Sequence, residues 1–149
     1  MPRQGRTRLL ATLFAGLVVL AATLGSGVRE ASAAGSTISL GTYTATGVCH
    51  DGVCKWTPIP LSYLRVTGSG FTPNAPVIVQ IIALSSFSIV DDYVVGASAS
   101  GAIDAKTAIR FCPPASSSQS FMVRAMNVAT WSYSNIRTGA TCPGSSLPG

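Results

Sequence analysis

The stretch Ala102-Ile103-Asp104-Ala105-Lys106-Thr107-Ala108-Ile109-Arg110-Phe111 decides the fold class of this 149-residue chain. Its odd-numbered positions are apolar or small and hold Ile103, Ala105, Thr107, Ile109 and Phe111. Three of its even-numbered positions are charged and hold Asp104, Lys106 and Arg110. Alternation with period two is typical of a β-strand that places one face on a core and the other in solvent. We therefore expect a half-buried strand here.

Similar β-rich runs lie on both sides of this stretch, separated by Gly, Pro, Asn and Ser. The run from Val77 to Leu84 is apolar at nearly every position, which favours a central strand. The expected strands are residues 37–46, 47–49 paired with 53–57, 63–68, 77–84, 88–97, 102–111, 121–129 and 135–141. Seven or eight strands predict an all-β, immunoglobulin-like antiparallel sandwich over residues 34–142, followed by a flexible C-terminal tail at 143–149.

The first 33 residues have the three parts of a secretory signal peptide. Arg3, Arg6 and Arg8 precede an apolar run from Leu9 to Leu24, and Ala31-Ser32-Ala33 supplies small residues for cleavage after Ala33. A retained transmembrane anchor is the alternative, but the apolar run is shorter than the ~20 residues of a spanning helix. We expect a signal helix that is cleaved, a secreted protein, and no membrane contact after cleavage.

Cleavage changes the charge balance of the chain. The whole sequence is 47% hydrophobic and 10% charged, with a net charge of +5. Four of its ten basic and one of its five acidic residues lie in the first 33, so the remaining 116 residues carry six and four, or net +2. The six cations are scattered singly, whereas binding to nucleic acid needs clustered Lys and Arg. The sequence predicts no nucleic-acid partner.

All four cysteines lie after the predicted cleavage site. In an exported chain an even number of cysteines predicts disulfides. Asp51-Gly52 is a strong signal for a two-residue type I′ hairpin turn, which places Cys49 directly opposite Cys54. Cys112 and Cys142 then pair by elimination. The competing four-cysteine zinc site lacks any CxxC spacing.

The segment from Val66 to Val77 reads V-T-G-S-G-F-T-P-N-A-P-V. It resembles the V-x-G-x-G-F-x-P-x-x-x-V opening of many secreted bacterial immunoglobulin-like domains. Ala99–Ala102 resembles the small-residue turn of those domains, and Phe121–Ala125 resembles the strand after it. The resemblance covers residues 63–129. Among these families, the neocarzinostatin-like apoproteins of enediyne chromoproteins are similar in size, secretion signal and number of disulfides. That similarity implies a carrier of a small apolar ligand.

Few residues of the chain after cleavage suit catalysis. Its single histidine, His50, lies beside Asp51 at the predicted turn, where neighbouring side chains tend to point to opposite faces. We interpret His50 as an exposed turn histidine. Asp91 and Asp92 form the only acidic pair, and one of them is expected to face solvent. No GxSxG nucleophile motif is present. The sequence predicts no enzyme activity, no cofactor and no metal site.

Aromatic residues near predicted strand ends are the candidates for binding. Trp131 and Tyr133, with Asn135, lie between two expected strands, and Phe87 lies between two others. Aromatic side chains on sandwich loops can stack on sugars or fill a pocket of a partner. Trp131 folding back onto the core is the alternative. Trp56 and Tyr43 are expected to pack against each other or the core.

Two classes of function follow from these features. The first is a secreted, non-catalytic binding or structural module that meets a protein or a cell-envelope glycan through loops or a strand edge. The second is a small-molecule carrier. A deep apolar cleft lined by Trp131, Tyr133 and Phe87 favours the carrier, whereas a flat or convex surface there favours the module.

Overall fold

The computed structural model describes residues 35–112 and 119–147, which form strands and turns without a helix. The expected signal peptide at residues 1–33 lies outside the described residues. Within the described ranges, no helix is long and apolar enough to cross a membrane.

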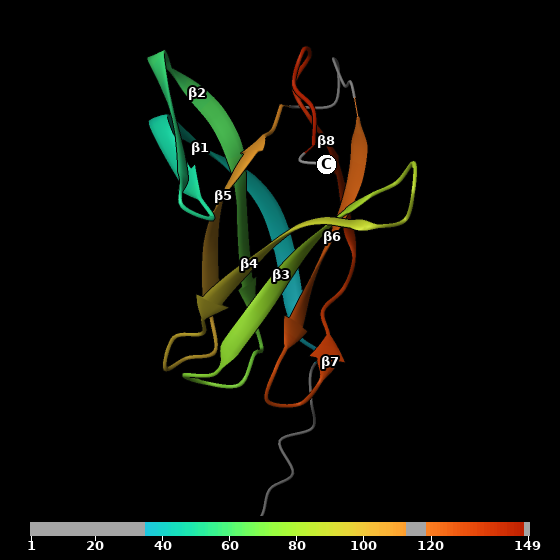
Figure 1. Ribbon diagram of the computed structural model, residues 1–149. Coiled ribbons are helices and arrows are strands. Elements are labelled where there is room, and N and C mark those ends of the chain that lie inside the picture. The colour runs from blue at the N-terminus through green and yellow to red at the C-terminus, as the bar shows by residue number, and fades with distance from the viewer. Residues whose placement is uncertain (1–34, 113–118, 148–149) are drawn as a thin grey trace, which may run out of the picture. The chain divides into compact units, whose positions relative to one another are not determined.

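Eight antiparallel strands form two sheets (Figure 1). The first sheet has the order β1-β2-β5. In the second sheet β4, β3 and β6 are neighbours in that order, and both β7 and β8 pair with the far side of β6. The strands are β1 (Thr37–His50), β2 (Val53–Ser69), β3 (Pro76–Ala83), β4 (Ile89–Gly96), β5 (Ile103–Arg110), β6 (Ser120–Asn127), β7 (Ser132–Tyr133) and β8 (Arg137–Ala140).

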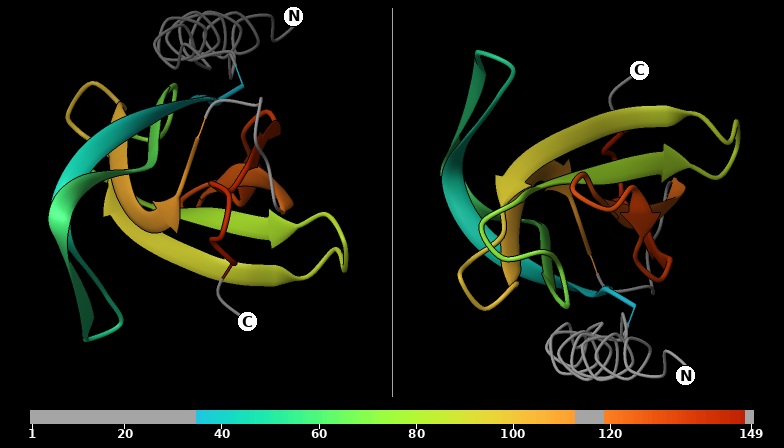
Figure 2. Two further views of the ribbon diagram at one scale, coloured as in Figure 1. Left: turned by 90° about the horizontal axis from the view of Figure 1, so that it is seen from above. Right: turned by 90° about the horizontal axis from the view of Figure 1, so that it is seen from below.

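The hydrophobic core lies between the two sheets, as in a β-sandwich. Figure 2 shows β1, β2 and β5 on one side and β3, β4 and β6 on the other. The odd-numbered positions of β5 are buried as the sequence predicts, and β3 is a central strand between β4 and β6. Residues from both sheets fill the core, including Ile38, Leu64, Val66, Ile103 and Ile109 from the first and Val77, Val79, Ile81, Phe121 and Val123 from the second.

The β1–β2 hairpin is longer than the sequence predicts. The four expected pieces at 37–46, 47–49, 53–57 and 63–68 form only two continuous strands. Their pairing is interrupted where Ala45 faces Leu61 but Gly47 faces Trp56, so β2 has extra residues at that point. We call residues 37–45 with 61–69 the inner hairpin, and residues 47–60 the outer hairpin.

Two prolines explain the interruption. Pro58 and Pro60 lie in the extra segment of β2 and have no N–H to donate to a neighbouring strand. The hydroxyl of Thr57 donates instead to the carbonyl of Ile59 at 2.7 Å, and the carbonyl of Thr46 lies 3.3 Å from the same oxygen. Beyond this irregular segment the hairpin curls, and its turn comes close to β4 (Figure 1).

The strand expected at residues 135–141 is wrong in its extent. The chain forms two short strands, β7 and β8, because Ser134 bonds to β6 through its side chain as well as its backbone, and Asn135 turns toward β1. The hydroxyl of Ser134 accepts from the Ala125 amide at 2.9 Å. The side-chain oxygen of Asn135 accepts from the Ile38 amide of β1 at 2.6 Å, which links the two sheets.

Part of the C-terminal segment, which the sequence predicts to be a flexible tail, contacts the sandwich. Leu147 packs against the core, and its amide donates to the Gln119 side chain at 2.7 Å. The nearby Cys112–Cys142 disulfide anchors the start of this segment. Residues 143–147 therefore contact the sandwich, and residues 148–149 lie outside the described part.

Candidate functional site

The tip of the outer hairpin has the geometry that its sequence predicts. Asp51 and Gly52 have φ angles of 48° and 77°, and a type I′ turn requires positive values at both positions. Cys49 lies opposite Cys54 and is bonded to it, while His50 lies opposite Val53. The second bond joins Cys112 to Cys142, the pairing expected by elimination.

His50 is not the exposed turn histidine expected from the sequence. Its Nε2 lies 2.6 Å from Oδ1 of Asp91 on β4, and its ring stacks on Tyr93 with centroids 4.2 Å apart. Because an ionised carboxylate only accepts, Nε2 donates in this bond. Asp51 also does not point away: its Oδ2 lies 3.4 Å from the same nitrogen. The curl of the outer hairpin brings these groups together, which local alternation could not reveal.

The network continues from Asp91 to β5. The Tyr93 hydroxyl donates to Oδ2 of Asp91 at 2.7 Å and accepts from the Ala108 amide at 2.9 Å. The Asp91 side chain is only 7% exposed, so both of its oxygens need these partners. Burial, followed by the bond to Asp91, raises the pKa of Tyr93 well above its usual value. The hydroxyl therefore stays protonated and acts as a donor.

A sequence signal for this network existed. Asp91 and Tyr93 are two residues apart on one strand, so they share a face, and that face is turned inward. A carboxylate on the inward face of a strand requires a buried donor. His50 is the only histidine of the chain. The expectation that one of the two aspartates faces solvent is met by Asp92, which is exposed.

The same residues could hold a metal ion. Among the described residues, His50, Asp51 and Asp91 bring potential ligand atoms within 4.8 Å of one another. Two ligands of one tetrahedral zinc ion, bound at about 2.0–2.1 Å, lie about 3.3 Å apart. The 2.6 Å between His50 and Asp91 is shorter and fits a charge-assisted hydrogen bond. We therefore interpret the cluster as a polar link between the outer hairpin and the sandwich.

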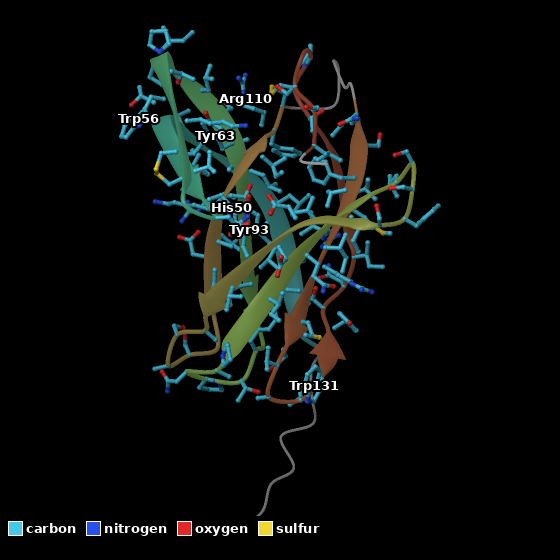
Figure 3. All side chains as sticks on the ribbon, in the orientation of Figure 1. His50, Trp56, Tyr63, Tyr93, Arg110 and Trp131 are labelled. Carbon is cyan, nitrogen blue, oxygen red and sulfur yellow. A yellow bond between two sulfur atoms is a disulfide. The ribbon has the colours of Figure 1, made fainter. Side chains whose placement is uncertain are left out.

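A cavity of about 550 Å³ lies beneath the outer hairpin. Its walls come from the outer hairpin, from the adjoining part of β2, from β4 at Asp91, from the end of β5 and from the C-terminal segment. The apolar part includes Val48, Val53, Leu61, Ile109 and Leu147, and the polar part includes His50, Lys55, Tyr63, Asp91 and Arg110. Figure 3 shows Arg110 and Tyr63 on one side of this region and His50 with Tyr93 on the other. No pattern in the sequence predicted this site.

Trp131 and Phe87, two of the candidate binding residues, are exposed but far apart. Trp131 is 73% exposed and does not fold back onto the core, and Phe87 is 72% exposed. Phe87 follows the end of β3 at Ala83, which pairs with Phe121, whereas Trp131 follows the opposite end of the paired strand β6. Both residues have positive φ angles, 53° for Phe87 and 54° for Trp131, which are costly for bulky side chains.

Tyr133 and Asn135 complete the predicted set. Tyr133 is half exposed, and the guanidinium of Arg124 lies 4.2 Å from the centre of its ring. Asn135 is occupied by its bonds to β1 and is not free to bind a partner through its side-chain oxygen. None of the four candidates lines the cavity beneath the outer hairpin. That cavity is therefore not the cleft lined by Trp131, Tyr133 and Phe87 that would favour a carrier.

Trp56 also differs from its expected position. It packs neither on Tyr43 nor on the core, and it is 78% exposed. Its six-membered ring lies against the backbone of Gly47, where an added Cβ would approach the ring to 2.4 Å. Tyr43 instead packs on Tyr63, with ring centroids 5.7 Å apart, and donates to the Thr107 carbonyl.

Comparison with known proteins gives no relative for this chain. No protein-family model matches it, and neither the curated proteins nor the solved structures contain a match.

Proposed function

We propose that this protein is a secreted, non-catalytic binding module with an immunoglobulin-like sandwich fold. Its partner is a protein or glycan of the extracellular space or cell envelope. The strand order supports this fold: β1, β2 and β5 share one sheet, while β3, β4, β6, β7 and β8 share the other. Immunoglobulin-like domains divide their strands between two sheets in a similar way.

Two features support secretion. The first 33 residues have the pattern of a signal peptide. The two disulfides are typical of an oxidising, extracellular environment.

Both tryptophans of the chain are exposed, and this observation carries the binding proposal. Tryptophan side chains are highly buried on average, and exposed ones are enriched at the energetic centres of interfaces. Trp56 is held against Gly47, and Trp131 is held in a turn whose backbone conformation favours glycine. Neither position serves the core. A surface role is the remaining physical reason for a large aromatic side chain at these places.

The two tryptophans lie in separate regions of the molecule, which favours an extended partner. In Figure 3, Trp56 is on the outer hairpin and Trp131 is at the β6–β7 turn, at the opposite end of the sandwich. One small molecule cannot contact both. A polymer or a protein surface is large enough to contact both ends.

The surroundings of His50 support a non-catalytic role. The two oxygens of Asp91 accept from His50 and Tyr93, so this carboxylate already has its partners. Within the described ranges, no serine hydroxyl or other nucleophile is bonded to His50. The network therefore acts as a structural link.

Retention on the cell envelope tests the proposal. The purified protein is mixed with envelope of the producing cells, and the bound fraction is measured by sedimentation. We expect Trp56→Ala or Trp131→Ala to weaken retention at least tenfold. Val94→Ala, which shortens another exposed apolar residue, is the matched control and should change retention less than twofold. Gly47→Ala, which displaces the Trp56 ring, should act like Trp56→Ala.

Treating the envelope with protease or with a glycan hydrolase before mixing identifies the chemical class of the partner. Loss of retention after protease treatment identifies a protein, and loss after glycan hydrolysis identifies a glycan. Absence of retention on every fraction, or equal retention of wild type and both tryptophan variants, contradicts the proposed function.

A further inference from the structure

The cavity beneath the outer hairpin carries positive charge that the described residues do not neutralise. Lys55 and Arg110 line it, and neither makes an ion pair in the described part of the chain. Asp91 is the acidic residue of the lining, and His50 and Tyr93 already occupy its two oxygens. The lining therefore has a net charge of +1 when His50 is neutral.

Arg110 is the group most in need of a partner. Its Nε is buried and has no hydrogen-bond partner in the described part of the chain. The guanidinium carbon lies 6.0 Å from the centre of the Tyr63 ring, which orients the side chain without satisfying its N–H groups. Figure 3 shows the two side chains next to each other at one end of the region. A guanidinium presents parallel donors that match a carboxylate.

The rest of the cavity suits an apolar body. Val48 and Ile109 are buried core-type residues on two of its walls, and Leu61 and Leu147 are partly buried. A volume of about 550 Å³ is within the range of small-molecule sites, which combine apolar walls with a few convergent polar groups.

We propose that this cavity binds a small carboxylate with an apolar body. The carboxylate accepts from the guanidinium of Arg110, with Lys55 contributing to the positive potential. The apolar body lies along Val48, Leu61 and Ile109. This site is separate from Trp56 and Trp131, so the inference stands independently of the proposed function.

The charge of the lining distinguishes a carboxylate from other ligands. A net charge of +1 matches a single negative charge, whereas a phosphate monoester carries nearly two at neutral pH. A cationic ligand would meet Lys55 and Arg110, while both oxygens of Asp91 already accept hydrogen bonds from the protein. A neutral apolar ligand would leave Arg110 unpartnered.

Titration of the purified protein with three matched ligands tests the proposal. Decanoate, decanol and decyl phosphate share one chain and differ in the head group. We expect decanoate to bind at least tenfold more tightly than either of the others, measured by calorimetry. Arg110→Gln should lower the affinity for decanoate at least tenfold and remove the preference for decanoate over decanol. Arg124→Gln removes a charge on β6 that does not line the cavity and should change affinity less than twofold.

Further variants keep the proposal testable if Arg110→Gln does not fold. Ala108→Phe adds a ring from the β5 wall, leaves Arg110 in place and should abolish binding of all three ligands. If Arg110→Gln does not fold, Arg110→Lys takes its place and should lower decanoate affinity because the fork of donors is lost. Equal binding of decanoate and decanol overturns the proposal, as do tighter binding of decyl phosphate and unchanged binding in Ala108→Phe.

Discussion

The inner and outer hairpins are parts of the same two strands, yet different forces hold them. In the inner hairpin, Ile38, Leu64 and Val66 are fully buried between the sheets. In the outer hairpin, Trp56 is exposed, and the structure depends on the Cys49–Cys54 bond and on the contact between His50 and Asp91.

The difference teaches how a small domain can expose apolar residues without losing its fold. Apolar burial is non-directional and stabilises the inner hairpin in proportion to the area removed from water. A covalent bond and a buried polar network fix geometry instead, and they leave one face of the outer hairpin free. The outer hairpin can therefore carry Trp56 on one face and a cavity on the other.

The largest expected effect is the loss of stability in Leu64→Ala, compared with Trp56→Ala in the other half of β2. Leu64→Ala should lower the free energy of unfolding by about 3–5 kcal/mol, because it leaves a cavity in a filled core. Trp56→Ala should change it by less than about 0.5 kcal/mol, because the side chain is exposed. Denaturant titration measures both values. Similar losses of unfolding free energy in the two variants would contradict the claim that the two halves of β2 are stabilised differently.

The next largest effects are expected from the two disulfides, which should contribute unequally to stability. The bond between Cys112 and Cys142 closes a loop with a sequence separation of 30 and should stabilise by about 4 kcal/mol, on the loop-entropy model. The bond between Cys49 and Cys54, with a separation of 5, should stabilise by about 2 kcal/mol. Paired Cys→Ser variants and thermal unfolding test the order. In the second pair, faster hydrogen exchange should be confined to the outer hairpin.

Tyr93→Phe should have a smaller effect that depends on pH. It removes a donor to Asp91 and an acceptor for the Ala108 amide, at a cost of about 1–3 kcal/mol near neutral pH. Because the folded state raises the pKa of Tyr93, the corresponding stability is complete below about pH 10 and is lost as the pH rises above it.

Alkaline denaturation measures this dependence. The wild type should lose stability above pH 10 more steeply than Tyr93→Phe. Tyr133→Phe, at an exposed tyrosine, serves as the control and should follow the wild type. A wild-type slope equal to that of Tyr93→Phe would contradict the role of the buried hydroxyl.

The smallest effect is expected from an ion pair between the inner hairpin and β5. Arg65 on β2 donates twice to Asp104 on β5, at 2.8 Å each, but both side chains are exposed. The hydrogen bond from Arg65 lowers the pKa of Asp104, so any stabilisation is present above its usual pKa and is lost as the pH falls. At pH 7, the free energy of unfolding of Asp104→Asn should differ from that of the wild type by about the error of denaturant titration. At pH 2, the two values should be equal.

Asp91→Asn provides the contrast for that measurement. It alters a carboxylate of the same kind where it is buried and bonded to the outer hairpin. We expect a clearly larger loss than in Asp104→Asn, accompanied by increased hydrogen exchange near His50. An equal effect at the two positions would show that burial does not distinguish the two carboxylates.

Much of the fold could be predicted because its signals are local. Alternation in residues 103–110 correctly predicted the buried face of β5. The apolar run in β3 correctly indicated a central strand. Strand boundaries near Pro58, Pro60 and Asn135 were wrong, because there the chain satisfies its polar groups with partners outside the ladder.

The candidate site was predicted only in part. Exposure of Trp131 and Phe87 agrees with the aromatic candidates, but these residues do not lie together. The cavity, Arg110 and the buried contact of His50 were missed. Each depends on residues far apart in the sequence, such as His50 and Asp91, which are 41 positions apart.

The sequence by itself determined the all-β class, the Asp51–Gly52 turn and the pairing of Cys49 with Cys54. Those features depend on period-two alternation and on a turn whose geometry fixes the residues beside it. Only the tertiary structure decided the curl of the outer hairpin, and with it the cavity and the partners of His50. A strand can bend at an interruption in several directions, and the direction is selected by contacts with β4 and β5 that no local pattern encodes.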